Sequence, residues 1–142
     1  MIIRKANISD LKQIINIFIK ENSKKPYYEK WSTKSALIKI NNYFKNDKIN
    51  VIIVENKLAG FIIYNEVLTS KGKNLWVHEL FIDSNFQNKG LGTALMNNLA
   101  KTYSKKISSI NLLANRNASA YNFYKKLKYK ELDESAFMYK KL

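Results

Sequence analysis

The fold is decided by the segment LFIDSNFQNKGLGT, which occupies residues 80–93. A hydrophobic run passes there into a polar loop, and the loop enters a helical pattern through Gly90-x-Gly92. Glycine lets the backbone approach a ligand closely, and the first amides of a helix lack partners and carry a partial positive charge. The segment therefore predicts a helix N-terminus that binds a pyrophosphate, with the charge of Lys89 beside it.

Two common phosphate-binding motifs do not fit this segment. A Walker loop needs the pattern G-x-x-x-x-G-K-[ST], which is absent. A dinucleotide-binding fingerprint needs a third glycine three residues after Gly92, and Leu95 stands there. On its own, the G-x-G pattern fits many other phosphate-binding loops, or a helix start in which the glycines are incidental.

Outward from this segment, the hydrophobic pattern predicts a mixed α/β fold of the α+β type. The predicted strands are Ile2–Lys5, Ile49–Val54, Leu58–Val67, Leu75–Ile82, Ile107–Ala114, Tyr129–Leu132 and Ala136–Tyr139. Helical spacing is seen within Leu11–Ile19, Leu37–Phe44, Leu91–Tyr103 and Asn117–Leu127. We expect the order β-α-α-β-β-β-α-β-α-β-β, with about seven strands in a largely antiparallel sheet flanked by about four helices, as one domain over residues 1–142.

The composition of the chain limits the partners, the location and the chemistry that can be expected of it. The chain has 25 Lys and Arg against 11 Asp and Glu, a net charge of +14, but the lysines are scattered and no basic-aromatic motif predicts a specific nucleic-acid partner. No run approaches the roughly 20 apolar residues of a membrane span, so no membrane partner is predicted. Cysteine is absent, which fits a cytoplasmic location and excludes a thiolate nucleophile. No cluster has metal-ligand spacing, so no metal is expected.

Two motifs carry a resemblance to a known family. The hexapeptide QNKGLG, residues 87–92, resembles the Q/R-x-x-G-x-G/A motif of the Gcn5-related N-acetyltransferase (GNAT) superfamily, and NASAYNFYKKL, residues 117–127, resembles its N-x-x-A-x-x-F-Y-x-K-L segment. The chain departs from the family pattern at Lys128-Tyr129, where Gly-Phe is usual, and at Ser84, where proline is common. The resemblance implies a GNAT-like fold and an acetyl-CoA-dependent N-acyltransferase.

The resemblance also implies a set of cofactor-binding residues. Backbone groups of Leu80, Phe81 and Ile82 should hold the pantetheine arm of acetyl-CoA as an added strand would. Asn117 should reach the pantetheine or the phosphates, and Tyr124 should contact the cofactor and serve as general acid for the departing thiolate. The amides expected to hold the pyrophosphate are those of Gln87, Asn88, Lys89, Gly90, Leu91, Gly92 and Thr93.

The general base is predicted to be Glu79, since the attacking amine must lose a proton and several family members resemble this chain in carrying an acidic group there. Strand alternation sends Glu79 and Phe81 to one face and His78 and Leu80 to the other. His78, the only histidine, and a water relay to a more distant carboxylate are the alternatives. The amide of Phe81 or Leu80 would meet the oxyanion. No Ser-His-Asp or Cys-His arrangement supports a covalent intermediate, so direct transfer in a ternary complex is expected.

The acceptor side is predicted to include Tyr27, Tyr28, Glu29 and Trp31, which could grip an amine by stacking or charge or could be ordinary lid packing. A peptide or protein N-terminus, an amino acid, a polyamine and an aminoglycoside all remain open as acceptors. The alternative function is a non-catalytic domain that senses acyl-CoA or scaffolds a partner. A homodimer is a further expectation from the resemblance.

Overall fold

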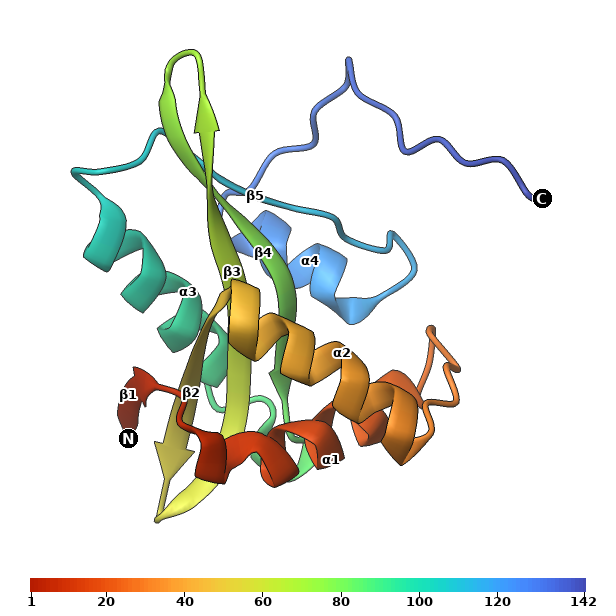
Figure 1. Cartoon of the computed structure of the whole chain (residues 1–142). Helices are drawn as coiled ribbons and strands as arrows, with labels where there is room; N and C mark the ends of the chain where they lie inside the picture. Colours follow the sequence, from red (N-terminus) through yellow and green to blue (C-terminus); the bar gives the residue numbers. More distant parts are fainter.

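The computed structural model describes all residues from Met1 to Leu142 and contains one five-stranded sheet with the order β1-β2-β3-β4-β5 (Figure 1). Strands β1 to β4 pair antiparallel, and β5 pairs parallel to β4. The elements are β1 (Ile2–Lys5), α1 (Leu11–Asn22), α2 (Thr33–Asn46), β2 (Lys48–Val54), β3 (Lys57–Thr69), β4 (Gly72–Ile82), α3 (Leu91–Tyr103), β5 (Ile110–Leu112) and α4 (Ser119–Lys126), with short 3-10 helices at Ile8–Asp10 and Ser84–Phe86. The expected mixed, mostly antiparallel α/β fold with four helices is confirmed.

The sheet separates two hydrophobic clusters. On one face α1 and α2 pack against β2 and β3, with Ile14, Phe18 and Ile40 fully buried. On the other face α3 packs through Leu95, Met96 and Leu99, and Phe123 and Tyr124 of α4 join the same cluster. Burying apolar side chains on both faces is the main force that holds the helices to the sheet.

Two local features of the sequence, a helix cap and a hairpin turn, have the expected conformations in the structure. The side chain of Ser32 accepts a hydrogen bond from the Ser35 amide at 3.1 Å and so caps α2. The turn between β2 and β3 is a two-residue loop, in which Glu55 has φ 49° and Asn56 has φ 60°. Two successive positive φ values give the turn that matches the right-handed twist of a hairpin.

The two predicted closing strands, Tyr129–Leu132 and Ala136–Tyr139, are wrong. The chain after α4 has no helix or strand. Tyr129 still packs against Tyr124, and the segment beyond it runs away from the body of the protein to the C-terminus (Figure 1). Leu132, Phe137, Met138 and Tyr139 are 66% to 86% exposed. A strand needs a partner edge, and β5 has only three residues instead of the predicted Ile107–Ala114, so the sheet has five strands.

Candidate active site

The site begins where β4 and β5 separate. The parallel pairing of these strands covers Leu75 to Val77 on β4 and ends at the pair Val77–Leu112. Beyond that pair β4 continues to Ile82 and bonds to β3 alone. The second edge of residues 78–82 therefore has N–H and C=O groups with no neighbouring strand, which is a template for an extended, amide-bearing ligand.

The predicted helix N-terminus lies directly after this open edge. Asp83 caps the short helix Ser84–Phe86 by accepting from the Asn85 amide at 2.8 Å. The loop then reverses through Asn88 at φ 61° and Gly90 at φ 75°, and α3 starts at Leu91. No side chain caps α3, so its first amides are available to an anion.

The two glycines of the loop have different roles. A Cβ atom at Gly90 would meet no atom within 4 Å, so this face of the loop is open, and the positive φ there favours glycine. A Cβ atom at Gly92 would lie 3.2 Å from Cζ of Phe123, which shows that Gly92 lets α3 approach α4 closely. The loop is therefore open to solvent at Gly90, next to the uncapped first turn of α3, and the residues present there fit a pyrophosphate group.

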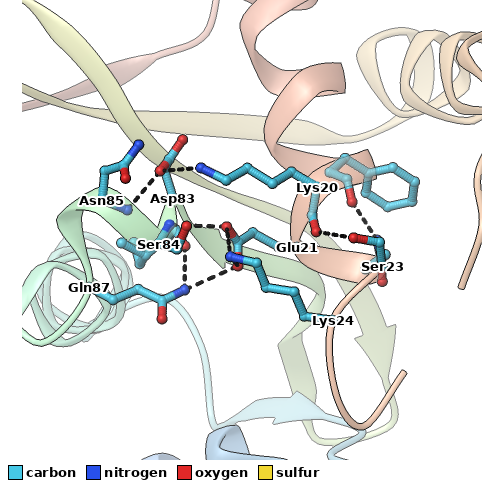
Figure 2. Close-up of polar contacts among 11 residues, drawn as sticks. Lys20, Glu21, Ser23, Lys24, Asp83, Ser84, Asn85 and Gln87 are labelled. Carbon is cyan, nitrogen blue, oxygen red and sulfur yellow. Dashed lines mark hydrogen bonds and ion pairs between the residues drawn. The ribbon is translucent and has the colours of Figure 1, made fainter. Parts of the chain in front are cut away.

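The side chain of Gln87 is engaged by the protein. Its Nε2 donates to the carbonyl of Ile82 at 2.8 Å and to Oε2 of Glu21 at 3.2 Å (Figure 2). Lys89 is exposed and its Nζ lies 5.7 Å from the centre of the Phe86 ring. Gln87 thus fixes the shape of the loop, while the Lys89 ammonium extends beside it.

A cavity of about 280 Å³ lies against the open edge of β4. It brings Glu79, Leu80 and Phe81 of β4 together with Tyr124 of α4. The other lining residues are Phe18, Asn22, Tyr27, Glu29, Trp31, Lys39, Val77, His78, Leu112, Leu113, Ala114, Asn115 and Ala120. The Glu79 carboxylate and the Tyr124 phenol, which come from different elements, therefore share a single cavity, which is the arrangement that acid–base chemistry requires.

Glu79 is the most perturbed carboxylate of the cavity. Its side chain is 18% exposed, and burial raises its pKa from the ordinary 4.5 to about 7. The ammonium of Lys39, 3.9 Å from Oε1, and the Tyr43 hydroxyl, which donates to Oε1 at 3.2 Å, act in the opposite direction. A carboxyl group with a pKa near 7 can accept a proton at neutral pH more effectively than an ordinary glutamate.

The structure corrects the predicted face of His78. Ile63 pairs with Glu79 and the next residue, Tyr64, pairs with Val77, so His78 is the extra residue of a β-bulge. Its ring stacks on Tyr43 with centroids 5.7 Å apart, and Tyr43 also bonds to Glu79. His78 therefore lies on the same side of the sheet as Glu79, and its Nε2 is within 2.9 Å of the Asn65 side-chain oxygen.

Tyr124 lines the same cavity from α4. Its ring packs edge-on against Phe123 and Tyr129, with centroids 5.0 Å and 5.7 Å away. Burial raises the pKa of its hydroxyl, and the charge of Glu79 adds to that effect. The phenol is therefore protonated at neutral pH and can act as a hydrogen-bond donor inside the cavity.

Three of the four predicted acceptor residues meet at the cavity. Tyr27, Glu29 and Trp31 line it, and the Trp31 indole donates to Oε2 of Glu29 at 2.7 Å. Burial raises the pKa of Tyr27, and the charges of Glu79 and Glu29 raise it further. Tyr28 is 60% exposed and does not line the cavity.

The predicted role of Asn117 is not matched by a place in the cavity. Its side chain is exposed just before α4, and its amide donates to the Asn115 side chain at 2.8 Å. Asn115 lines the cavity instead. Sequence reasoning missed Lys39 and Tyr43, which reach Glu79 from α2, although both fall within the predicted helical segment Leu37–Phe44.

No group of three or more His, Cys, Asp or Glu side chains lies where it could hold a metal ion. None of the helices combines the length and the apolar composition that crossing a membrane requires.

The open edge of β4, the uncapped N-terminus of α3 and the cavity with Glu79 and Tyr124 are the features that an acyltransferase with a pyrophosphate-bearing acyl carrier would need. The chain belongs to the acetyltransferase (GNAT) family, whose model matches residues 13–129. Membership supports N-acetyltransfer as the general activity, with acetyl-CoA as the co-substrate that this family uses.

Solved structures confirm the fold. The chain is similar to a possible acetyltransferase from Clostridium difficile 630, with 20% identity and a TM-score of 0.87 over 99% of this chain and 97% of that one. A ribosomal-protein-alanine N-acetyltransferase from Brucella melitensis biovar Abortus 2308 is 16% identical, with a TM-score of 0.77 over 98% and 97% of the two chains. An aminoglycoside acetyltransferase from an uncultured soil metagenomic sample, solved with sisomicin, is 20% identical, with a TM-score of 0.73 over 99% and 95%. No curated protein matches the chain.

Proposed function

We propose that residues 1–142 form one N-acetyltransferase domain that moves the acetyl group of acetyl-CoA directly to a primary amine of a small molecule or peptide. The observation that carries this proposal is that Glu79 and Tyr124 line one cavity at the open edge of β4. The two groups are suited to opposite tasks, because burial brings one pKa to about 7 and keeps the other group protonated.

The acetyl-CoA would lie along β4 and end at α3. The backbone of Leu80, Phe81 and Ile82 would bond to the pantetheine amides, since this part of β4 has no strand on its second edge. The amides from Gln87 to Thr93 would hold the pyrophosphate, with the exposed Lys89 beside it. Asn117, exposed at the entrance to α4, would reach the outer part of the same ligand.

Glu79 would act as general base. An amine attacks only as the neutral form, so Glu79 takes a proton from the acceptor ammonium, directly or through a water. The amine nitrogen then bonds to the thioester carbon, and the oxyanion is met by an amide of Phe81 or Leu80. Lys39 and Tyr43 keep Glu79 charged enough to serve, because both favour its carboxylate form.

Tyr124 would act as general acid. When the carbon–sulfur bond breaks, its electron pair goes to sulfur, and the phenol hydroxyl donates a proton toward the developing thiolate. The amine nitrogen, which becomes cationic when it attacks, releases its extra proton to solvent. After the products leave, Glu79 releases the proton it took and the phenol recovers a proton from solvent. His78 is the weaker candidate for the base, because its ring is already stacked on Tyr43 and its Nε2 is bonded to Asn65.

The acceptor would enter past Tyr27, Glu29 and Trp31. Their carboxylate and aromatic faces suit an ammonium group, despite the overall charge of +14. The similar proteins act, by name, on an aminoglycoside and on a ribosomal-protein alanine, so both a small-molecule and a peptide amine stay within the proposal. A cytoplasmic location and a homodimer stay predictions.

The second candidate function is an acyl-CoA sensor or scaffold without turnover. A sensor needs the same open edge of β4 and the same anion-binding amides at the N-terminus of α3, but it needs neither a general acid nor a general base. The presence of both Glu79 and Tyr124 in the cavity favours the enzyme.

The test is to mix the purified protein with acetyl-CoA and a panel of amines and to follow the release of free thiol. The chain has no cysteine, so the protein gives no background in this assay. Release that depends on one class of amine supports the enzyme and names the acceptor. Binding of acetyl-CoA without release on any amine supports the sensor instead.

A further inference from the structure

Glu21 is a buried carboxylate that the proposed chemistry does not use. It lies in the last turn of α1 and is only 6% exposed. A negative charge at the C-terminal end of a helix is disfavoured by the helix dipole, and a buried carboxylate needs hydrogen-bond donors. The groups that donate hydrogen bonds to Glu21 therefore indicate its structural role.

Two of its partners belong to the loop that would hold the pyrophosphate. Oε1 accepts from the Ser84 amide at 3.0 Å, and Oε2 accepts from Nε2 of Gln87 at 3.2 Å (Figure 2). Gln87 Nε2 also donates to the carbonyl of Ile82. One carboxylate thus ties both ends of the short helix Ser84–Phe86, and Gln87 closes that helix back onto the end of β4.

Glu21 also lies beside the start of the loop that carries the predicted acceptor residues Tyr27 and Glu29. The next residue, Asn22, accepts the Glu29 amide at 2.9 Å through its carbonyl, and its side chain donates to the Phe18 carbonyl at 3.0 Å. The carbonyl of Lys24 accepts the Tyr27 amide at 3.0 Å, and its ammonium lies 3.2 Å from Oε1 of Glu21. The backbone that carries Tyr27 and Glu29 is therefore anchored within three residues of Glu21.

We propose that Glu21 is a positioning residue that holds two loops at a fixed separation. These are the acetyl-CoA loop, residues 84–93, and the acceptor loop, residues 23–32 between α1 and α2. This inference rests on the proposed function, because it takes the Ser84–Thr93 loop as the acetyl-CoA site. It assigns the Gln87 side chain to bracing this loop, so only the backbone of Gln87 is left to contact phosphate. Lys20, which bonds to Asp83 at 2.9 Å, forms a second tie between α1 and the loop, at a more exposed position.

The test compares three variants with the wild type. Glu21→Gln removes the charge and leaves one acceptor oxygen. Ser84→Pro removes the backbone donor to Glu21, together with a serine hydroxyl that makes no hydrogen bond. Proline suits the first position of a short helix, and Asp83 before it already has an extended ψ of 132°. Lys24→Met is the matched control, because it removes a half-exposed partner of the same carboxylate.

We expect Glu21→Gln and Ser84→Pro each to raise the calorimetric Kd for acetyl-CoA about tenfold, the usual effect of losing a hydrogen bond to a buried charge. The KM for the amine should rise in Glu21→Gln as well, while the pH dependence of kcat stays as in the wild type because Glu79 is untouched. Lys24→Met should change Kd less than about threefold, as exposed ion pairs contribute little. If Glu21→Gln and Ser84→Pro both lower the melting temperature but leave the Kd for acetyl-CoA unchanged, the inference is overturned while the proposed function stands. If the wild type binds no acetyl-CoA, the proposed function and the inference are both overturned.

Discussion

The hydroxyl of Tyr43 donates a hydrogen bond to Oε1 of Glu79 at 3.2 Å, and the two residues come from α2 and β4. This bond stabilises the charged carboxylate, as the Lys39 ammonium 3.9 Å away also does. Burial opposes both and is the largest effect, so the pKa of Glu79 rises to about 7. The position of α2 on the sheet therefore sets the pH range in which the proposed base works.

Glu79→Gln should lower kcat by about 100-fold, because general base catalysis contributes on that order. In the wild type, kcat should rise with pH through about 7, since the base acts only when deprotonated and its pKa lies there. The variant should lose this rise. A pH–rate profile measures both effects, and an unchanged profile would assign the base to His78 or to a water relay.

Tyr43→Phe should move the rise in kcat to higher pH by about one unit. The substitution removes a hydrogen bond to the charged form of Glu79, so its pKa must increase. The rate well above the new pKa should stay near that of the wild type. A lower rate at every pH with no shift would mean that Tyr43 acts by another route.

The raised pKa of Glu79 also predicts a pH-dependent stability. Between pH 4.5 and about 7 the folded state binds more protons at this group than the unfolded state does, so the wild type should lose stability as pH rises through this window. The loss is at most about 3 kcal/mol, from 1.36 kcal/mol per unit of pKa shift. Glu79→Gln should gain stability relative to the wild type over the same range. Urea melts of both proteins at pH 5 and pH 8 measure the difference, and equal pH dependence would contradict the burial argument.

Tyr124→Phe should lower kcat about 100-fold with a smaller change in the KM for acetyl-CoA, because only the donor to sulfur is lost and the ring still packs against Phe123 and Tyr129. Tyr129→Phe is the matched control, since its ring touches Tyr124 but does not line the cavity. Steady-state kinetics of the two variants separate the roles. Equal activity of Tyr124→Phe and the wild type would remove Tyr124 from the mechanism.

Gly90→Val should raise the KM for acetyl-CoA by more than about tenfold. A β-branched residue at φ 75° is strained, and its side chain would point into the open space that the pyrophosphate needs. Gly72→Ala is the control, because Gly72 also has a positive φ but lies in the β3–β4 hairpin, outside the site. Equal KM values in the two variants would show that Gly90 affects only stability.

The sequence predicted the parts of the site that depend on local chemistry. Gly90 and Gly92 lie at the start of α3, where the G-x-G pattern before a helical run predicted a helix N-terminus, and Tyr124 lines the same cavity as Glu79. The face of His78 could not be predicted, since a β-bulge adds a residue only when β3 and β4 are paired. The approach of Lys39 and Tyr43 to Glu79 depends on how α2 lies on the sheet, which no local pattern encodes.

The C-terminal segment also shows that a local sequence pattern does not by itself determine structure. Ala136–Tyr139 has the residue types of a strand, but it lies away from every strand edge and is exposed. Strand propensity describes how well a residue fits a pleated surface that already exists. The three residues of β5 offer too short an edge for that pattern to take effect.

The most direct test of the central claim is a calorimetric titration of the wild-type protein with acetyl-CoA in the absence of any amine. We expect saturable binding at one site per chain, competed by free coenzyme A and weakened in Gly90→Val. Absence of binding to the wild type would contradict the account, because the open edge of β4 and the N-terminus of α3 would then be a strand end and a turn with no ligand.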